Sequence, residues 1–117
     1  MTDIKNLTDR IIAFRDARDW KQFHNPKDLA LSLVLEAAEV MEHFQWKSKD
    51  EMEKYIVTNK SDIGEELADV LYWVLLMSAD LNIDILKDLE EKMALPIWIG
   101  QVYNALSGGI FLGGMVC

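Results

Sequence analysis

Four carboxylates stand in the sequence as two pairs with the same spacing. Glu36 is three residues before Glu39, and Glu66 is three residues before Asp69. On an α-helix this spacing places both side chains of a pair on one side, about one turn apart. Each pair lies in apolar sequence, where a carboxylate is normally paired with a cation, protonated or bound to a metal. If the two helices pack side by side, the carboxylates converge, and one or two Mg²⁺ ions, or Mn²⁺, would compensate their charge.

Spacing alone leaves other interpretations of these carboxylates open. Glutamates are common on the solvated faces of surface helices, where they need no partner. A di-iron bundle is a second alternative, but it requires Glu-x-x-His on two helices. Here His43 follows Glu39 by four residues, and the second helix has no histidine. The few lysines near the pairs, Lys21, Lys27 and Lys47, stand only at the margins, so the residues favour a divalent-metal site.

The elements that must position the carboxylates are all predicted to be helices. Apolar residues recur at helical spacing up to about residue 93, and no alternating strand pattern is present. Asn25 before Pro26, and Ser48 three residues before Glu51, are typical of helix N-termini. The predicted helices cover about residues 6–18, 26–46, 49–57, 62–78 and 85–93, with a loop at 58–61 and a cap at Asn82 or Asp84 before the last helix. The sequence therefore predicts an all-α bundle of four to five helices.

The composition bounds the class of partner. The 117 residues are enough for one domain with one core, and half of them are hydrophobic. The chain has 20 acidic and 12 basic residues, a formal net charge of −8, which argues against binding to nucleic acid or to an anionic membrane. A small anionic substrate is not excluded, since a bound cation can reverse the local sign. The single cysteine, Cys117, and the lack of an apparent signal peptide favour a cytoplasmic protein.

Several stretches resemble a known family. The segments 35–40 (LEAAEV) and 64–71 (GEELADVL) resemble the MazG-like all-α nucleoside triphosphate pyrophosphatases, whose pattern is Glu-x-x-Glu followed after a spacer by Glu-x-x-Asp. The segments 18–26 (RDWKQFHNP) and 44–48 (FQWKS) are similar to the dCTP pyrophosphatase branch of that family. The resemblance runs from about residue 4 to residue 93, which delimits a predicted pyrophosphatase domain at 1–93.

The resemblance implies an activity and a metal set. Proteins of this family hydrolyse nucleoside triphosphates between the α and β phosphates, giving a monophosphate and pyrophosphate. The expected ligands of Mg²⁺ are Glu36, Glu39, Glu66 and Asp69, and Glu39 is the expected acceptor of the proton from the attacking water. The metal would offset charge on the leaving pyrophosphate. The branch favours dCTP and related or modified deoxynucleotides, cleared from the nucleotide pool by a homodimer or a dimer of dimers.

The resemblance also implies a pocket for the base. Trp20 and Trp46 match the aromatic residues that enclose the base in this branch, with His24 nearby as a hydrogen-bonding group. Tyr72 and Trp73 follow Asp69 by one turn, so each is a candidate to lie beside the sugar, with core packing as the alternative. Aromatic faces stack on any base, so they give affinity rather than selectivity. Without the resemblance, tryptophans in a small bundle would be assigned to core packing.

The C-terminal segment 94–117 departs from the family pattern. Residues 93 to 117 contain no Asp, Glu, Lys or Arg and hold five of the six glycines. Relatives typically continue with basic residues that hold phosphate, so Lys47 is expected to take their place, with Lys49 or Lys54 as alternatives. We expect the segment to pack in an oligomer interface or to be an atypical end; a tail anchor is disfavoured by Pro96, by two Gly-Gly pairs and by the lack of flanking basic residues. A non-catalytic helical oligomerisation module is the alternative function.

Overall fold

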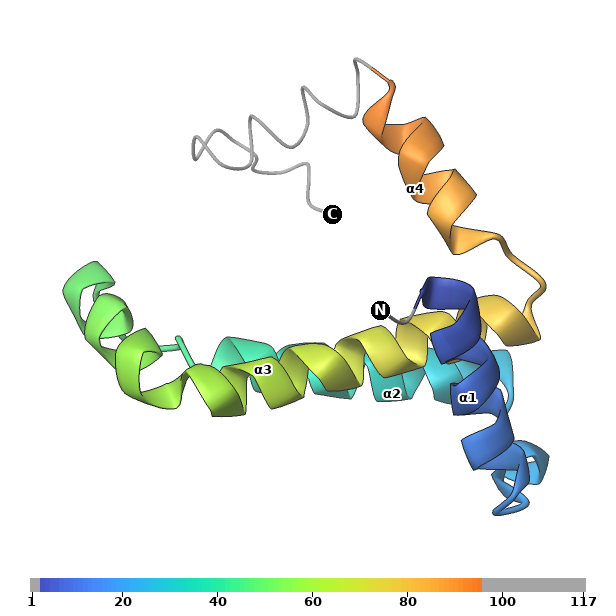
Figure 1. The fold of residues 1–117 in the computed structure, drawn as a ribbon. Coiled ribbons are helices and arrows are strands. Elements are labelled where there is room, and N and C mark those ends of the chain that lie inside the picture. Colours follow the sequence, from blue (N-terminus) through green and yellow to red (C-terminus); the bar gives the residue numbers. More distant parts are fainter. Residues whose placement is uncertain (1–2, 96–117) are drawn as a thin grey trace. The chain divides into compact units, whose positions relative to one another are not determined.

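The computed structural model describes residues 3–95, and every regular element in this range is helical (Figure 1). This confirms the predicted all-α class. The elements in chain order are α1 (Ile4–Asp16), the short 3₁₀ helix η1 (Trp20–Phe23), α2 (Pro26–Glu42), α3 (Lys49–Asp80) and α4 (Ile85–Met93). The chain forms two compact units, residues 1–83 and 84–117, and α4 lies in the second.

The last three helices begin at the capping residues that the sequence indicates, whereas α1 begins at Ile4, capped by Asp3, two residues before its predicted start. The side chain of Asn25 accepts a hydrogen bond from the backbone N–H of Asp28 (2.9 Å), with proline at the first position of α2. Ser48 and Glu51 form a complete capping box, in which each side chain accepts from the other residue's backbone N–H. Asp84, one of the two predicted candidates, caps α4. These side chains satisfy backbone donors that have no partner within a helix.

The predicted loop at 58–61 is present as a kink at Asn59, where two helical stretches meet within α3. Only Asn59 leaves helical geometry, with φ −117° and ψ 19°, and the helix bends there (Figure 1). The amide nitrogen of Asn59 donates to the carbonyl of Tyr55 (3.0 Å) and to the hydroxyl of Thr58 (2.9 Å). Such side-chain bonds compete with the backbone ladder and bend a helix without ending it. The predicted break between two helices is therefore confirmed at Asn59, but it is a kink at one residue rather than a four-residue loop.

The end of α2 also differs from the prediction. The helix ends at Glu42, before the predicted limit near Trp46. The N–H of His43 bonds to the carbonyl of Val40, and the N–H of Phe44 bonds to that of Met41. These three-residue bonds tighten the last turn, which is a common way to close an α-helix.

The first unit is organised around a pair of antiparallel helices. α2 and the part of α3 beyond Asn59 run side by side in opposite directions, and α1 packs against α3 (Figure 1). The buried apolar side chains come from all three helices: Ile11, Leu29, Leu75 and Leu76. This small core fixes one end of the pair, so that the middle of α2 faces the middle of α3.

Much of the apolar surface of the helix pair is not covered within one chain. Val34 and Leu35 on α2 expose 61% and 56% of their surface, and Leu67 on α3 exposes 53%. Large apolar side chains exposed in this number on two packed helices favour an interaction surface. Within residues 3–95, no helix is long and apolar enough to cross a membrane. The predicted boundary at residue 93 stays a prediction, and the roles suggested for the C-terminal segment concern residues that lie almost entirely outside the described part of the chain.

Candidate metal centre

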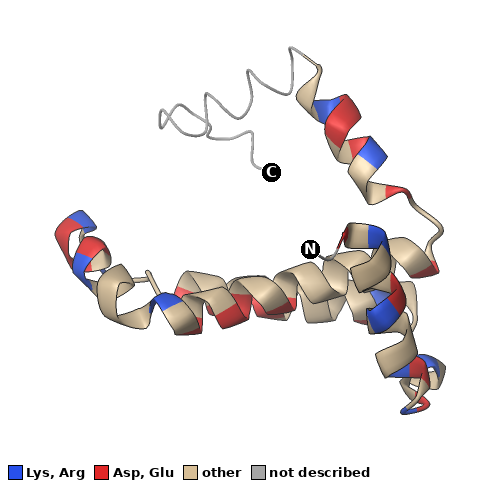
Figure 2. Ribbon diagram, in the orientation of Figure 1, with Lys and Arg blue, Asp and Glu red and all other residues tan. Residues whose placement is uncertain are grey.

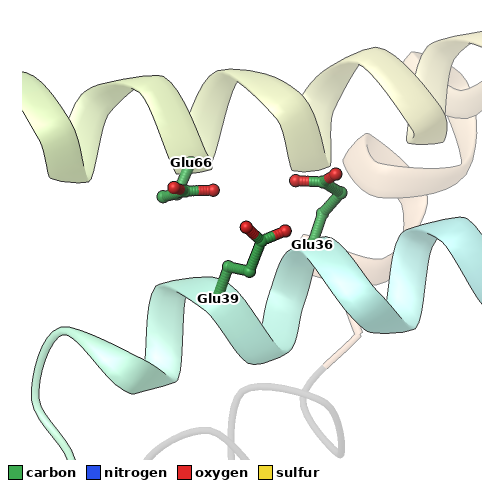
Figure 3. A group of neighbouring side chains, drawn as sticks. All are labelled: Glu36, Glu39 and Glu66. Atoms are coloured by element: carbon green, nitrogen blue, oxygen red, sulfur yellow. The ribbon is translucent and has the colours of Figure 1, made fainter.

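Three glutamates meet between α2 and α3. Glu36 and Glu39 project from α2 towards α3, and Glu66 projects from α3 towards α2 (Figure 3). One carboxylate oxygen from each lies within 4.8 Å of the other two, an arrangement that can hold a metal ion. The spacing of three residues brings the two α2 side chains to the same face, and the antiparallel packing supplies the third. We call Glu36, Glu39 and Glu66 the carboxylate cluster.

The charges of the cluster are not neutralised by the chain itself. Among the described residues, every ion pair lies elsewhere, so no basic nitrogen is within 4.0 Å of these carboxylates. Figure 2 shows acidic positions along α3 where it runs beside α2, and basic positions on α1, on α4 and in the first part of α3. The stretch from residue 61 to residue 86 contains no lysine or arginine. The cluster therefore carries uncompensated negative charge.

Glu36 is the most perturbed member of the cluster. Its Oε2 is buried and has no hydrogen-bond partner in the described part of the chain. Burial, followed by repulsion from Glu39 and Asp69, raises the pKa of Glu36 to about 7. The pKa of Glu66 is also raised, first by burial and then by Glu39 and Asp69. Desolvation and neighbouring like charge both disfavour the ionised form, and a bound cation would reverse both effects.

The donor set suits a hard divalent cation. Three carboxylates offer oxygen ligands only, and oxygen donors are preferred by Mg²⁺, Ca²⁺ and Mn²⁺. The buried oxygen of Glu36 that lacks a partner is the kind of group that metal coordination would satisfy. The residues present therefore fit a divalent ion.

Asp69, the fourth predicted ligand, is not part of the group within 4.8 Å. It lies one turn after Glu66 on α3, and its charge contributes to the raised pKa values of Glu36 and Glu66. It is thus close enough to act on the cluster electrostatically. A role as a direct ligand stays a prediction.

Two of the predicted substrate-binding residues pack together. His24, at the C-terminal end of η1, lies edge-on to the ring of Trp73 on α3, with 5.8 Å between ring centroids. Nδ1 of His24 is buried and has no hydrogen-bond partner in the described structure. Trp73 also packs edge-to-face on Tyr72, at 5.0 Å. Trp20 packs instead on Phe14 of α1, at 5.7 Å between centroids.

Trp46 and Lys47 lie in the short connection between α2 and α3. Trp46 has a positive φ of 70° and exposes 92% of its surface. A bulky residue costs about 1–2 kcal/mol in the left-handed region, so this conformation must be held by its surroundings. The ammonium of Lys47 lies 4.2 Å from the ring centroid of Tyr55. The described contacts do not join Trp20, His24 and Trp46 in one pocket, and that pocket stays a prediction.

Sequence reasoning overlooked His43 and Tyr55. Nδ1 of His43 is hydrogen-bonded to the hydroxyl of Tyr55 (2.5 Å), and the charge of His43 tends to lower the pKa of Glu66. The four-residue interval from Glu39 to His43 was a usable signal, because it places both side chains on one helix face. It served only to argue against a di-iron centre. Tyr55 gave no signal, since its contact depends on how α3 folds back.

Fold and site together define a class: an all-α protein with a cluster of carboxylates, able to hold a cation, between two antiparallel helices. The comparison with known families specifies it further. Residues 31–97 match the model of the MazG-like family, and the chain belongs to this family.

The similar proteins are pyrophosphatases. The chain is 38% identical to dCTP pyrophosphatase 1 of Rattus norvegicus over 82 residues, covering 68% of this chain and 48% of that protein. The protein of the same name from Homo sapiens is 37% identical over 82 residues. The chain thus spans about half the length of the curated relatives it matches. The crystal structure of a pyrophosphatase from Archaeoglobus fulgidus DSM 4304 superposes with a TM-score of 0.74 at 36% identity, covering 80% of this chain and 87% of that one.

Proposed function

We propose that this protein hydrolyses nucleoside triphosphates to monophosphate and pyrophosphate with the aid of Mg²⁺ or Mn²⁺. The observation that carries the proposal is the carboxylate cluster on α2 and α3, within the segment that matches the family model. The names of the relatives, dCTP pyrophosphatase 1, favour dCTP or a similar deoxynucleotide as the substrate. We place the activity in the cytoplasm, as a means of clearing unwanted nucleotides.

The proposed reaction adds one water across the bond between the α-phosphorus and the bridging oxygen. Glu36, Glu39 and Glu66 would hold the cation, with Asp69 at the edge of the site. When bound, a divalent cation supplies positive charge to phosphate oxygens and lowers the pKa of a bound water. The water oxygen bonds to the α-phosphorus, the bridging bond breaks, and pyrophosphate leaves. Glu39 accepts the released proton, and the packed helices keep the carboxylates in fixed orientation.

The remaining predicted residues would bind the nucleotide. The exposed indole of Trp46 offers a free face on which a base can stack. The buried Nδ1 of His24, beside Trp73, offers a hydrogen-bonding position for the base or sugar. Trp20 would close the other side, and Lys47 would contact the phosphates.

The proposed function is tested by measuring pyrophosphate release across a panel of canonical and modified nucleoside triphosphates. We expect release from dCTP with Mg²⁺ or Mn²⁺ and none after removal of metal by a chelator, because the cluster alone repels phosphate. Alanine at Trp46 is expected to raise KM by about tenfold, since base stacking contributes about 1–3 kcal/mol.

Two results would favour the alternative, a non-catalytic helical oligomerisation module. One is that every triphosphate remains intact with either metal. The other is that calorimetry detects no binding of Mg²⁺ or of a non-hydrolysable dCTP analogue.

We also propose that the uncovered faces of α2 and α3 pack against a second copy of the chain, giving a dimer or a dimer of dimers. The support is the exposed apolar surface that includes Val34, Leu35 and Leu67. Sedimentation equilibrium should give a multiple of the 13.4 kDa chain mass. A charge at the interface, as in Val34→Glu, should shift the protein towards the monomer. A wild-type monomer at high micromolar concentration would contradict this proposal.

A further inference from the structure

A cluster of aromatic and basic side chains joins the end of α2 to the first part of α3. Tyr55 is its centre. Its hydroxyl is hydrogen-bonded to Nδ1 of His43, and its ring lies 5.6 Å from the ring of His43 and 6.3 Å from that of Phe44. The ammonium of Lys47 lies over the same ring, 4.2 Å from its centroid. Tyr55 thus contacts three residues that flank or belong to the connection between the helices.

This connection has a conformation that its own sequence does not favour. Trp46 adopts a positive φ, and its indole packs on no ring of the described chain. The backbone bond from the N–H of Lys47 to the carbonyl of Phe44 and the cap at Ser48 hold the two sides of the turn. A strained backbone persists only where its surroundings determine it, and such residues concentrate at functional sites. The backbone bonds and the contacts of the Tyr55 side chain together hold the strained conformation at Trp46.

The aromatic and basic side chains around Tyr55 also lie near the carboxylate cluster. His43 stands one turn after Glu39 on the same face of the chain, and its charge acts on Glu66. The turn that follows carries Trp46 and Lys47. We therefore expect a nucleotide whose phosphates bind at the carboxylate cluster to contact this turn, which follows the end of α2.

We propose that Tyr55 is a positioning residue for the substrate: by contacting His43 and Lys47 it holds the Trp46–Lys47 turn ready to bind the triphosphate. The proposal rests on the proposed function. Tyr55 itself touches no reacting atom. Its ring keeps the ammonium of Lys47 near the turn, and its hydroxyl ties the ring to α2, so less freedom is lost when the nucleotide binds.

The test compares KM and kcat in four variants. Tyr55→Phe removes only the hydroxyl and should raise KM by about two- to tenfold, as for one ordinary hydrogen bond. Tyr55→Leu removes the ring and should raise KM by about three- to thirtyfold, as for a cation–π contact, with kcat within about twofold. Lys47→Ala should raise KM similarly, and the double variant Tyr55→Leu/Lys47→Ala should raise KM by clearly less than the product of the two single effects, because the contact between Tyr55 and Lys47 is lost only once. Lys60→Ala, which removes an exposed lysine elsewhere on α3, should leave KM unchanged.

A second measurement is independent of activity. The chain contains two histidines, so nitrogen NMR can resolve both imidazoles. Tyr55→Phe should shift Nδ1 of His43 and leave His24 unmoved. If KM is unchanged in the Tyr55 variants of an active enzyme, or if the effects of Tyr55→Leu and Lys47→Ala simply add, the positioning role is overturned and the proposed function stands. A wild-type protein that cleaves no triphosphate overturns both, and the NMR shift then reports a purely structural contact.

Discussion

Replacing Glu36 by glutamine is expected to abolish stabilisation of the protein by Mg²⁺ and to lower kcat/KM by more than about a hundredfold. Mutating a residue that only hydrogen-bonds to a metal ligand commonly lowers activity about 10- to 100-fold, and Glu36 is expected to be a ligand itself. Glu36 supplies a buried carboxylate oxygen that has no hydrogen-bond partner among residues 3–95. Glutamine keeps the shape of the side chain and removes its charge. Pyrophosphate release measures the activity, and the rise in Tm on adding Mg²⁺ measures metal binding, because a ligand that binds only the folded state stabilises it.

The same substitution should stabilise the protein when no metal is present. In the native state the pKa of Glu36 lies near 7, above its ordinary value of 4.5, because of burial and the charges of Glu39 and Asp69. Between these pH values the folded state binds more protons than the unfolded state, so stability falls as the pH rises. The favourable contribution is complete below about pH 4.5 and is lost as the pH passes about 7. Glu36→Gln should have a higher metal-free Tm at pH 8 and a weaker dependence on pH.

A matched control separates this effect from a general change in charge. Glu53→Gln makes the same chemical change on an exposed residue in the first part of α3, outside the cluster. It should change neither the response to Mg²⁺ nor the pH dependence of Tm. If Glu36→Gln retains both the activity and the metal-induced rise in Tm, the carboxylate cluster is not the metal centre.

The carboxylate cluster shows which features can be predicted from sequence. The spacing of Glu36 and Glu39 fixes their common face through helix geometry alone. The convergence with Glu66 required one further assumption, that the two helices pack side by side, and their apolar sequence supported it. Caps were predictable for a similar reason, because Ser48 and Glu51 act within one turn of chain. Local rules therefore gave the elements and most of the cluster.

The errors arose where a polar residue has two possible effects. Asn59 can end a helix or bend it, and the result depends on whether the helix on each side is held by packing. Here the chain bends at Asn59, and Tyr55, which precedes the bend, lies close to His43 across the connection between α2 and α3, a contact between residues 12 apart. The orientation of Trp20 towards Phe14 likewise depends on the conformation after α1, which no periodicity reports. Such contacts require the folded arrangement of the chain.

Loss of Asp80 is expected to lower the free energy of unfolding by about 3 kcal/mol, because it strands a buried charge. Arg15 of α1 is 1% exposed, and its guanidinium donates to Asp80 of α3 at 2.7 Å and to Asp16 at 3.1 Å. Burial alone would lower the pKa of Arg15, but hydrogen bonds and charge from Asp80 and Asp16 outweigh it, so the net shift is upward and the group stays charged. Asp80→Ala therefore leaves a buried cation with one partner. Urea unfolding at a fixed protein concentration measures the loss.

The different burial of Arg15, Asp16 and Asp80 predicts which of their variants loses the most stability. The side chain of Asp16 is 50% exposed, so Asp16→Ala should cost less than about 1 kcal/mol, as for a surface pair. In Arg15→Met/Asp80→Ala the stranded charge is gone and an apolar chain of similar length fills the space. This double variant should recover most of the stability lost in Asp80→Ala, because the penalty comes from the unpaired charge rather than from the missing attraction. If the double variant is no more stable than Asp80→Ala, the ion pair itself holds α1 to α3. The apolar core around Ile11 would then contribute less to the packing of α1 on α3 than the burial of Ile11 indicates.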